Sequence, residues 1–394
     1  MLCTIEVKLY LSKSQERTLS GWLRTACWTY NRALEHRIKA WKRRRESVTF
    51  NKQSALLTVW RSRVGDLASA PVEIERDALR RVDRGMRAFF RRCKTGEAPG
   101  FPRFRPHQRY NSMEFLDLAK YVIGSNVRIP KLGKVRARGI GRVVGEQRFL
   151  RVIRRASGWY AQVVCEDGID APVKRPIVNS VGIDVGLTTF AALSNGETFP
   201  APRFAERSRK RVRGIQRRVS RRVKGSQGRR KAVDRLRRVY ERIFSQRRNF
   251  AHQLGTDLVR RFDMIAVEDL NVKGLARSKL ARSVNDAAWS IFTAQLERKA
   301  ERAGVTVVRV DPRGTSQECP SCGRVAKKQL SERAHSCKSC GLVLDRDVAA
   351  ARVILARALG GSREQSPVEE SASVCADRSH GQVGPVKREA LVAN

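Results

Sequence analysis

The 394-residue sequence has no long hydrophobic run. A membrane-spanning helix needs about 18 or more consecutive apolar residues, and no such window occurs. The N-terminal stretch MLCTIEVKLYLSKSQ is too short in its apolar part, and too early in its charges, for a secretory signal. We therefore expect a cytoplasmic protein without a membrane partner.

Acidic residues are scarce relative to basic ones. The chain has 38 Asp and Glu against 81 Lys and Arg, a formal net charge of +43 at pH 7. Such a chain repels itself unless a polyanion neutralises it. Nucleic acid is therefore the expected partner, and the hydrophobic content of 41% is enough for folded domains rather than a disordered chain.

Cysteine does not follow the pattern of a disulfide framework, because the count of nine is odd and five of the nine are scattered. The other four form two CxxC pairs separated by 14 residues, each followed by glycine, a spacing that predicts a closed tetrahedral zinc site with a structural role. We expect His335 to lie in a loop and not to bind the metal. The expected zinc ligands are Cys319, Cys322, Cys337 and Cys340.

Alternation and periodicity divide the chain into unlike segments. Residues 2–10 alternate as a strand, 11–95 have helical periodicity, and short alternating runs follow Gly and Pro breaks from 96 to about 175. From about 176 apolar strands alternate with helices, which predicts a mixed α/β domain. The polar segment 361–394 lacks periodicity and is predicted to be disordered.

Within the second domain, residues 203–248 contain twenty Lys and Arg against three acidic residues. Two helical stretches flank a GSQG break, so we expect a basic helical hairpin that binds nucleic acid. The alternative is a solvated helix face. The hairpin arginines, which we take as candidate nucleic-acid contacts, are Arg217, Arg218, Arg221 and Arg222.

Three carboxylates lie at the ends of apolar elements: Asp184, Glu268 and Asp347. A buried carboxylate is costly without a cation, and a divalent metal is the natural one. Two Mg²⁺ ions held by such residues can hydrolyse a phosphodiester. Each acid alone could instead cap a turn or a helix. We expect Asp347, which shares a helix face with small apolar residues, to be a ligand and Asp345 to be the helix N-cap.

Several motifs, taken in this order, resemble the TnpB family of transposon-encoded OrfB proteins, relatives of the type V CRISPR effectors. The resemblance covers about 1–360. The motifs are WTYNRAL (28–34), GFPRFR (100–105), GIDVGLTTFAALSNG (182–196), VEDLNVKGL (267–275), VDPRGTSQECPSCG (310–323), and CKSCG with the following DRD (337–347).

The resemblance implies an RNase H-like RuvC nuclease domain at 176–315 and 341–360, with Asp184, Glu268 and Asp347 as its magnesium-binding catalytic triad. It further implies a zinc-ribbon insert that binds target nucleic acid at 316–340, a helical recognition lobe at 11–95, and an oligonucleotide-binding-like wedge β-barrel built from 1–10 and 96–175.

By the same resemblance, the protein binds a guide RNA from the transposon end and cleaves double-stranded DNA beside a short adjacent motif, with sequence read by base pairing. One position departs from the family pattern DRDxNAA, because Ala349 stands where Asn is usual.

Four other functions stay open from the sequence. They are an RNA-guided DNA-binding protein that cuts weakly or not at all, a compact type V CRISPR effector, a transposase that joins DNA ends, and a zinc-ribbon DNA-binding regulator of transposition. A transposase with a tyrosine nucleophile is excluded, because the five scattered histidines form no pair beside a tyrosine.

Overall fold

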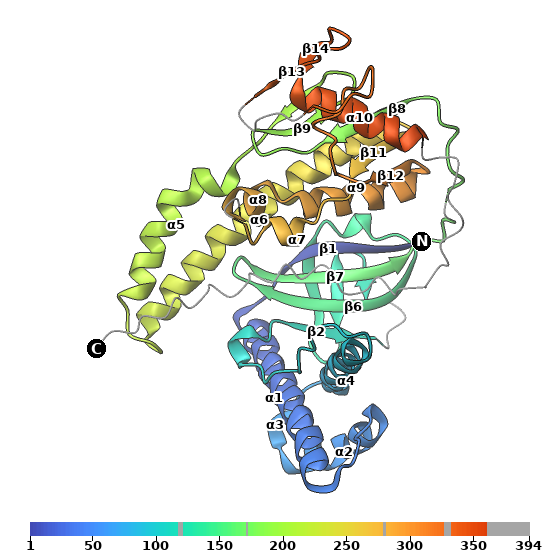
Figure 1. Ribbon diagram of the computed structural model, residues 1–394. Helices are drawn as coiled ribbons and strands as arrows, with labels where there is room; N and C mark the ends of the chain where they lie inside the picture. Colours follow the sequence, from blue (N-terminus) through green and yellow to red (C-terminus); the bar gives the residue numbers. More distant parts are fainter. Residues whose placement is uncertain (117–120, 171, 279–280, 327–331, 361–394) are drawn as a thin grey trace.

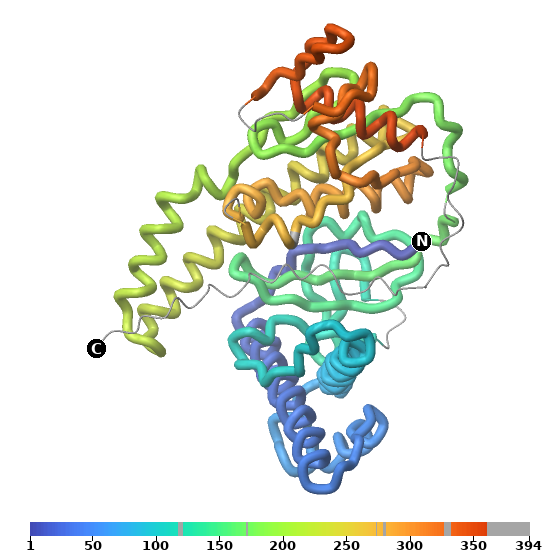
Figure 2. The backbone as a smooth tube through the Cα atoms, viewed as in Figure 1, coloured from blue at the N-terminus to red at the C-terminus, as the bar shows by residue number. Residues whose placement is uncertain are grey.

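The computed structural model describes residues 1–116, 121–170, 172–278, 281–326 and 332–360. The predicted disorder of 361–394 therefore concerns residues outside the described part of the chain. Two sheets organise the molecule, with a helical bundle at one end and the cysteine-rich segment at the other (Figures 1 and 2). The mixed α/β architecture agrees with the sequence prediction.

A helical bundle forms the end opposite the cysteine-rich segment. Its longest helix begins at a capping box, in which the Ser12 hydroxyl accepts a hydrogen bond from the Gln15 N–H and the Gln15 side chain accepts one from the Ser12 N–H. The buried side chains Leu19, Trp22 and Leu23 recur at helical spacing and face the core. The helices are α1 (Lys13–Arg44), α2 (Phe50–Arg63), α3 (Gly65–Ser69) and α4 (Val72–Lys94).

The first sheet is antiparallel and has seven strands in the order β2-β6-β7-β1-β5-β4-β3. Residues 2–10 thus lie between β7 and β5 in this sheet, and they share one hydrophobic core with α1 and α4. The strands are β1 (Leu2–Tyr10), β2 (Ser112–Phe115), β3 (Val122–Ile123), β4 (Asn126–Ile129), β5 (Gly133–Arg138), β6 (Glu146–Arg155) and β7 (Gly158–Glu166).

In the described residues no backbone ladder joins the two edge strands, β2 and β3, so the pairings form an open sheet. The edges approach through side chains instead. The Tyr121 hydroxyl donates to the carbonyl of Phe115 at 2.7 Å, and Gln147 Oε1 accepts the N–H groups of Tyr121 and Val122. Side-chain hydrogen bonds, rather than a closing ladder, therefore connect this part of the sheet.

The second sheet has five strands in the order β10-β9-β8-β11-β12. The strands β8, β11 and β12 are parallel, whereas β9 and β10 continue from β8 as antiparallel hairpins. Strand β8 thus lies in the centre of the sheet, with β9 as its hairpin partner. The strands are β8 (Ser180–Asp184), β9 (Thr189–Leu193), β10 (Thr198–Pro200), β11 (Met264–Glu268) and β12 (Thr306–Val310).

Helices cover both faces of this sheet (Figure 1). In β11, Ile265 and Val267 pack with helices α6 and α9, whereas Met264 and Ala266 pack with Ile354 of α10. Both sets are buried, which explains why the strand is apolar throughout. The elements are α5 (Phe204–Ser220), α6 (Gln227–Arg261), α7 (Val272–Leu275), α8 (Ala281–Ala287), α9 (Trp289–Ala303), β13 (Ala334–Ser336), β14 (Val343–Asp345) and α10 (Arg346–Gly360).

Helices α5 and α6 form the predicted basic hairpin, although α6 continues beyond residue 248 to Arg261. The C-terminal half of α6 buries Leu254 and Leu258 in the core of the second sheet. Its N-terminal half projects from the body together with α5 (Figure 1). The turn between them ends at Ser226, whose hydroxyl caps α6 by accepting the N–H of Arg229 at 3.1 Å.

No helix in the described residues is long and apolar enough to cross a membrane.

Candidate metal centres and nucleic-acid interface

Asp184 and Glu268 are the last residues of two neighbouring parallel strands, β8 and β11. Ile183 lies opposite Val267 in the ladder, so the next residue of each strand reaches the same edge of the sheet. Parallel strands end on one side of a sheet, where ligands commonly bind. The structure thus places these two predicted site residues beside each other.

Asp347 reaches the same edge from the first turn of α10. This helix lies so close to β8 that a Cβ atom on Gly182 would be 2.0 Å from the carbonyl oxygen of Ala351. Only glycine fits at such an approach. Nearby, a Cβ atom on Gly186 would lie 3.9 Å from Asp347 Oδ2, which places that carboxylate beside the residues that follow β8.

Electrostatics link the three carboxylates. Burial, followed by the negative charges of Glu268 and Asp347, raises the pKa of Asp184 from 3.8 to about 8. Burial also raises the pKa of Glu268, against which a hydrogen bond from Thr315 and the charge of Arg357 act. A carboxyl that is costly to ionise, beside two other acids, is a typical functional-site arrangement.

The donor set fits Mg²⁺, which prefers carboxylate oxygens. The carboxylate of Asp184 makes no hydrogen bond and no ion pair within the described residues, so its oxygens are not committed to a protein partner. Among the described residues, only the four cysteines form a compact group of three or more metal-ligand side chains. The three acids lie further apart than that. Two ions spaced by about 4 Å require a wider arrangement of ligands than one ion does.

Asp345 caps α10, as predicted. Its Oδ1 accepts hydrogen bonds from the N–H groups of Asp347 at 2.9 Å and Val348 at 3.2 Å. These bonds satisfy two of the N–H groups that a helix start leaves without partners. Its side chain is therefore engaged with the backbone, whereas the nearest charged partner of Asp347 is Arg346 at 3.7 Å.

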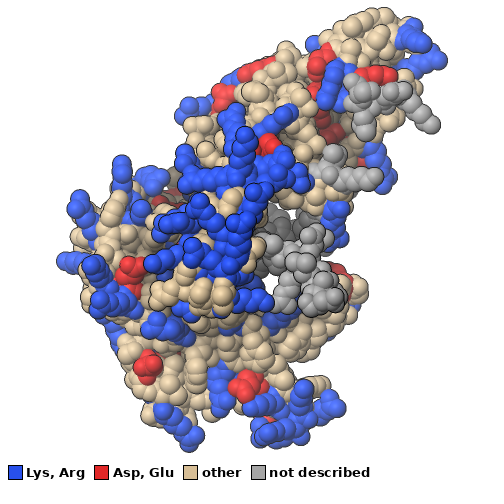
Figure 3. All heavy atoms as spheres, turned by 90° about the vertical axis from the view of Figure 1, so that its left-hand side faces the viewer, with Lys and Arg blue, Asp and Glu red and all other residues tan. Residues whose placement is uncertain are grey.

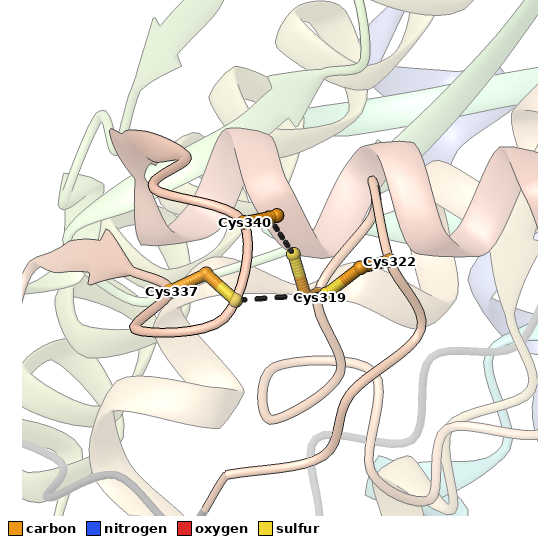
Figure 4. A group of neighbouring side chains, drawn as sticks. All are labelled: Cys319, Cys322, Cys337 and Cys340. Carbon is orange, nitrogen blue, oxygen red and sulfur yellow. Dashed lines mark hydrogen bonds between the residues drawn. The ribbon is translucent and has the colours of Figure 1, made fainter.

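The four cysteines converge (Figure 4). The Sγ atoms of Cys319 and Cys340, and those of Cys322 and Cys337, lie 3.6 Å apart, and all four lie within 4.8 Å of one another. A tetrahedral zinc site with Zn–S bonds of about 2.3 Å has S···S distances of about 3.8 Å, far longer than a disulfide bond. The cluster is therefore compatible with structural zinc.

Each CxxC pair sits on a turn of the same shape. The N–H of Gly323 donates to the carbonyl of Cys319, and that of Gly341 to Cys337, both at 2.9 Å. The two glycines have φ angles of 71° and 73°, which explains why glycine follows each pair. Backbone N–H groups of the second turn lower the pKa of Cys337 to about 6, which favours the metal-binding thiolate.

The expectation that His335 lies in a loop is wrong, because it belongs to strand β13 and its ring is buried. Opposite Leu344 in the β13–β14 ladder, it packs inside the small lobe. The segment around it is too short to show strand periodicity in the sequence.

Sequence reasoning missed two residues that support Glu268. The buried Thr315 donates its hydroxyl to Glu268 Oε1 at 2.6 Å. Arg357 of α10 fixes the loop that carries Thr315, because it donates to the carbonyl oxygens of Asp311 and Arg313 at 2.9 Å. The motif VDPRGTSQECPSCG contains Thr315, but only the fold brings its hydroxyl to the end of β11.

The hairpin arginines are all exposed. Arg217 and Arg221 line one hollow on α5, whereas Arg218 and Arg222 line another between α5 and α6. None of the four has a carboxylate partner within the described residues. Seen from the side on which the hairpin projects, basic side chains gather in a broad continuous patch (Figure 3).

Comparison with known proteins gives the family. A family described as "Probable transposase" (OrfB_IS605) matches residues 162–279, and one described as "Cas12f1-like, TNB domain" matches 289–354. A protein of Streptomyces pristinaespiralis named "Putative RNA-guided DNA endonuclease" is 34% identical over 90% of this chain and 89% of its own length. The chain belongs to the TnpB (OrfB) family.

Another relative, one solved structure and a further family model are also similar to this chain. An Escherichia coli K12 protein, "Putative RNA-guided DNA endonuclease InsQ", is 29% identical over 84% of this chain and 86% of its own length. The solved "mini-RNA-guided endonuclease CRISPR-Cas_phi3" is 10% identical, with a TM-score of 0.46 over 91% of this chain and 92% of that one. A family described as "Helix-turn-helix domain" matches 1–46, where this member has a strand and one long helix.

Proposed function

We propose that the protein is a Mg²⁺-dependent, RNA-guided DNA endonuclease of the RuvC type, in which Asp184, Glu268 and Asp347 hold the catalytic metal. The observation that carries this proposal is the convergence of three carboxylates at one sheet edge, with the pKa of Asp184 raised to about 8. The names of the family relatives that cover most of this chain support the reaction type.

The strand order of the second sheet also supports an RNase H-like domain. Three strands that run β10-β9-β8 antiparallel, followed by two strands parallel to β8, place the ends of β8 and β11 side by side. Bound Mg²⁺ would stabilise the negative charge on the attacking and leaving oxygens in phosphodiester hydrolysis. By donating to its Oε1, Thr315 orients Glu268 and opposes the rise in pKa that burial causes.

We propose that the cysteine cluster binds one structural zinc ion. Four thiols fill a tetrahedral shell and leave no open position for a water molecule, so the chemistry belongs to the carboxylates. The segment 316–340 would then be the family's target-nucleic-acid-binding insert. We further propose the wedge for 1–10 and 96–175, the recognition lobe for 11–95, and the nuclease domain for 176–315 and 341–360.

The partners in this proposal are a guide RNA and a double-stranded DNA target. A basic surface that contacts the phosphates of the guide–target duplex needs no base readout, because base pairing reads the sequence. The exposed hairpin arginines suit that role, since an arginine without a carboxylate partner can bind phosphate bidentately.

Ala349 stands where the family pattern usually has Asn, and it is buried in α10 at 2% exposure. Because alanine has no side-chain amide, this position offers none to the carboxylates.

The test uses the full chain co-expressed with RNA from its own locus. We expect one discrete RNA to copurify, and its sequence identifies the DNA to be cut. Asp184→Ala and Glu268→Ala should abolish Mg²⁺-dependent cleavage and leave RNA-guided DNA binding nearly intact, because they remove metal ligands rather than phosphate contacts.

The matched control is Asp269→Ala, which removes the acid next to Glu268. Its side chain is 63% exposed and pairs with Arg309, so we expect cleavage near the wild-type rate. Wild-type cleavage by either Asp184→Ala or Glu268→Ala would refute the triad. Binding without cleavage by the wild-type protein would favour the inactive DNA-binding alternative.

A further inference from the structure

The segment GFPRFR crosses the surface of the helical bundle without helix or strand structure, yet it is held firmly. Asn31 of α1 donates its amide N–H to the carbonyl of Arg105 at 2.9 Å and accepts the N–H of Arg105 at 2.8 Å. The guanidinium of Arg105 lies 4.8 Å from the ring centre of Tyr30. These contacts fix the C-terminal end of the segment on α1.

A second attachment fixes its middle on α4. A Cβ atom on Gly85 would lie 3.3 Å from Pro102 Cγ, so the proline ring packs directly on the glycine of that helix. The ring of Phe101 meets that of Phe89 edge-on, at a centroid distance of 5.2 Å. The segment is therefore a pre-formed surface feature, clamped between two helices.

Aromatic rings remain exposed on this clamped surface. The exposed fractions are 53% for Phe90, 44% for Phe101 and 56% for Phe104. Phe89 contacts both Phe90 and Phe101 at 5.2 Å, so these three rings form one cluster. A cluster of aromatic rings on a fixed surface leaves a contiguous apolar area in contact with water, and such an area commonly marks an interaction site.

The charge around the rings is basic. Arg91 and Lys94 on α4, and Arg103 between the two exposed rings of the segment, are exposed and have no carboxylate partner within the described residues. An apolar partner surface would have to desolvate these cations, whereas an unpaired strand offers phosphates for them and bases for the rings.

We propose that Phe90, Phe101 and Phe104 form a stacking platform for unpaired bases of RNA, with the neighbouring cations on its phosphates. That the strand is RNA rests on the proposed function, whereas the stacking does not. Helix α4, which carries Phe90, belongs to the bundle, at the opposite end of the molecule from β8 and α10 (Figure 1). A strand held there is remote from the proposed cleavage chemistry, which suits an RNA that is retained rather than cut.

The test separates stacking from charge. Fluorescence anisotropy measures the affinity of the full-length protein for two RNA oligomers of equal length. One oligomer has bases throughout, and the other has abasic sites in its central part. The test variant, Phe90→Leu/Phe101→Leu/Phe104→Leu, keeps apolar bulk and all charges. The matched control is Tyr10→Leu, which replaces an aromatic residue that is 48% exposed at the end of β1.

We expect the wild-type protein and the control to prefer the base-bearing RNA, and the triple variant to lose about tenfold of that preference, since stacking on an aromatic ring contributes strongly for each base. The salt dependence should not change, because no charge changes. An unchanged preference in the triple variant would overturn the platform.

A deoxy oligomer pair forms the second arm of the test. A loss of preference as large with DNA as with RNA would overturn the assignment to RNA. Loss of cleavage does not enter either readout, so failure of the platform and failure of the proposed nuclease activity are distinguishable. The substituted rings are exposed, and thermal unfolding of each variant checks that folding is unchanged.

Discussion

Asp184→Asn should stabilise the protein when no divalent metal is present. The pKa of Asp184 is raised from 3.8 to about 8, so the folded state holds a proton that the unfolded chain releases. Below pH 4 both states are protonated and the carboxyl costs nothing. As pH rises from 4 to 8 the cost grows, and above pH 8 it stays constant.

The magnitude follows from the raised pKa of Asp184. Each pKa unit corresponds to about 1.4 kcal/mol, so a rise of about 4 units costs at most about 6 kcal/mol above pH 8 and about 2 kcal/mol at pH 5. Water that enters the site would solvate the anion and reduce the cost. Allowing for this solvation, we expect Asp184→Asn to raise the free energy of unfolding at pH 9 by about 3 kcal/mol, with a smaller gain at pH 5.

With Mg²⁺ bound, the wild-type protein should instead be more stable than Asp184→Asn, because a cation favours the ionised carboxylate. The assay is urea unfolding of both proteins at pH 5 and pH 9, with EDTA and with Mg²⁺. Asp269→Asn is the control, since that exposed acid should show neither effect. The reasoning fails if Asp184→Asn gives no pH-dependent gain in EDTA, or if Mg²⁺ stabilises both proteins equally.

Two further predictions concern charges whose roles differ by position. Neutralising the hairpin arginines to glutamine should weaken nucleic-acid binding and flatten the log–log salt slope by up to about one unit for each phosphate that the variant no longer neutralises; an unchanged slope would mean a solvated helix face. Asp347→Asn should eliminate cleavage in a guide-loaded assay, whereas Asp345→Asn, which keeps a capping side chain, should cost at most about 1 kcal/mol of stability and preserve activity. The reverse result would assign the metal to Asp345.

The sequence predicts the two strand-borne carboxylates because their signal is local. A carboxylate that ends a short apolar run lies at a strand end, and parallel strands bring such ends together. Asp184 and Glu268 follow this rule. The capping role of Asp345 is equally local, since it depends only on N–H groups two and three residues further along the chain.

Non-local contacts could not be predicted in the same way. The close approach of α10 to β8 at Gly182 brings together two segments about 170 residues apart. In the sequence, Gly182 is only one residue of a predicted strand, and nothing there indicates the helix that packs on it. The pairing of β1 between β7 and β5 is similarly distant. Thr315 escapes sequence reasoning for the same reason, because its hydroxyl meets Glu268 only after the loop folds back.

The small cysteine-rich lobe controls where α10 begins. Strand β14 runs directly into the helix, and Asp345 is both its last residue and the cap of α10. Asp345 also lies opposite Ala334 in the β13–β14 ladder, and the N–H of Arg346 donates to the carbonyl of Arg333 at 2.8 Å. The first helical turn, which carries Asp347, is thereby fixed to the lobe.

The cysteine cluster should therefore affect cleavage through position and not through chemistry. We expect one zinc ion per chain in freshly purified, reduced protein, and its loss in Cys337→Ala/Cys340→Ala, because thiolate ligation supplies folding energy to a lobe with few apolar residues. That variant should lose cleavage even with excess Mg²⁺, since the β13–β14 hairpin no longer holds Asp347 beside Asp184. Cys93→Ala, which changes an exposed cysteine outside the cluster, should keep both zinc and activity. A zinc-free variant that cleaves at the wild-type rate would show that α10 keeps its place through its packing on β8 alone.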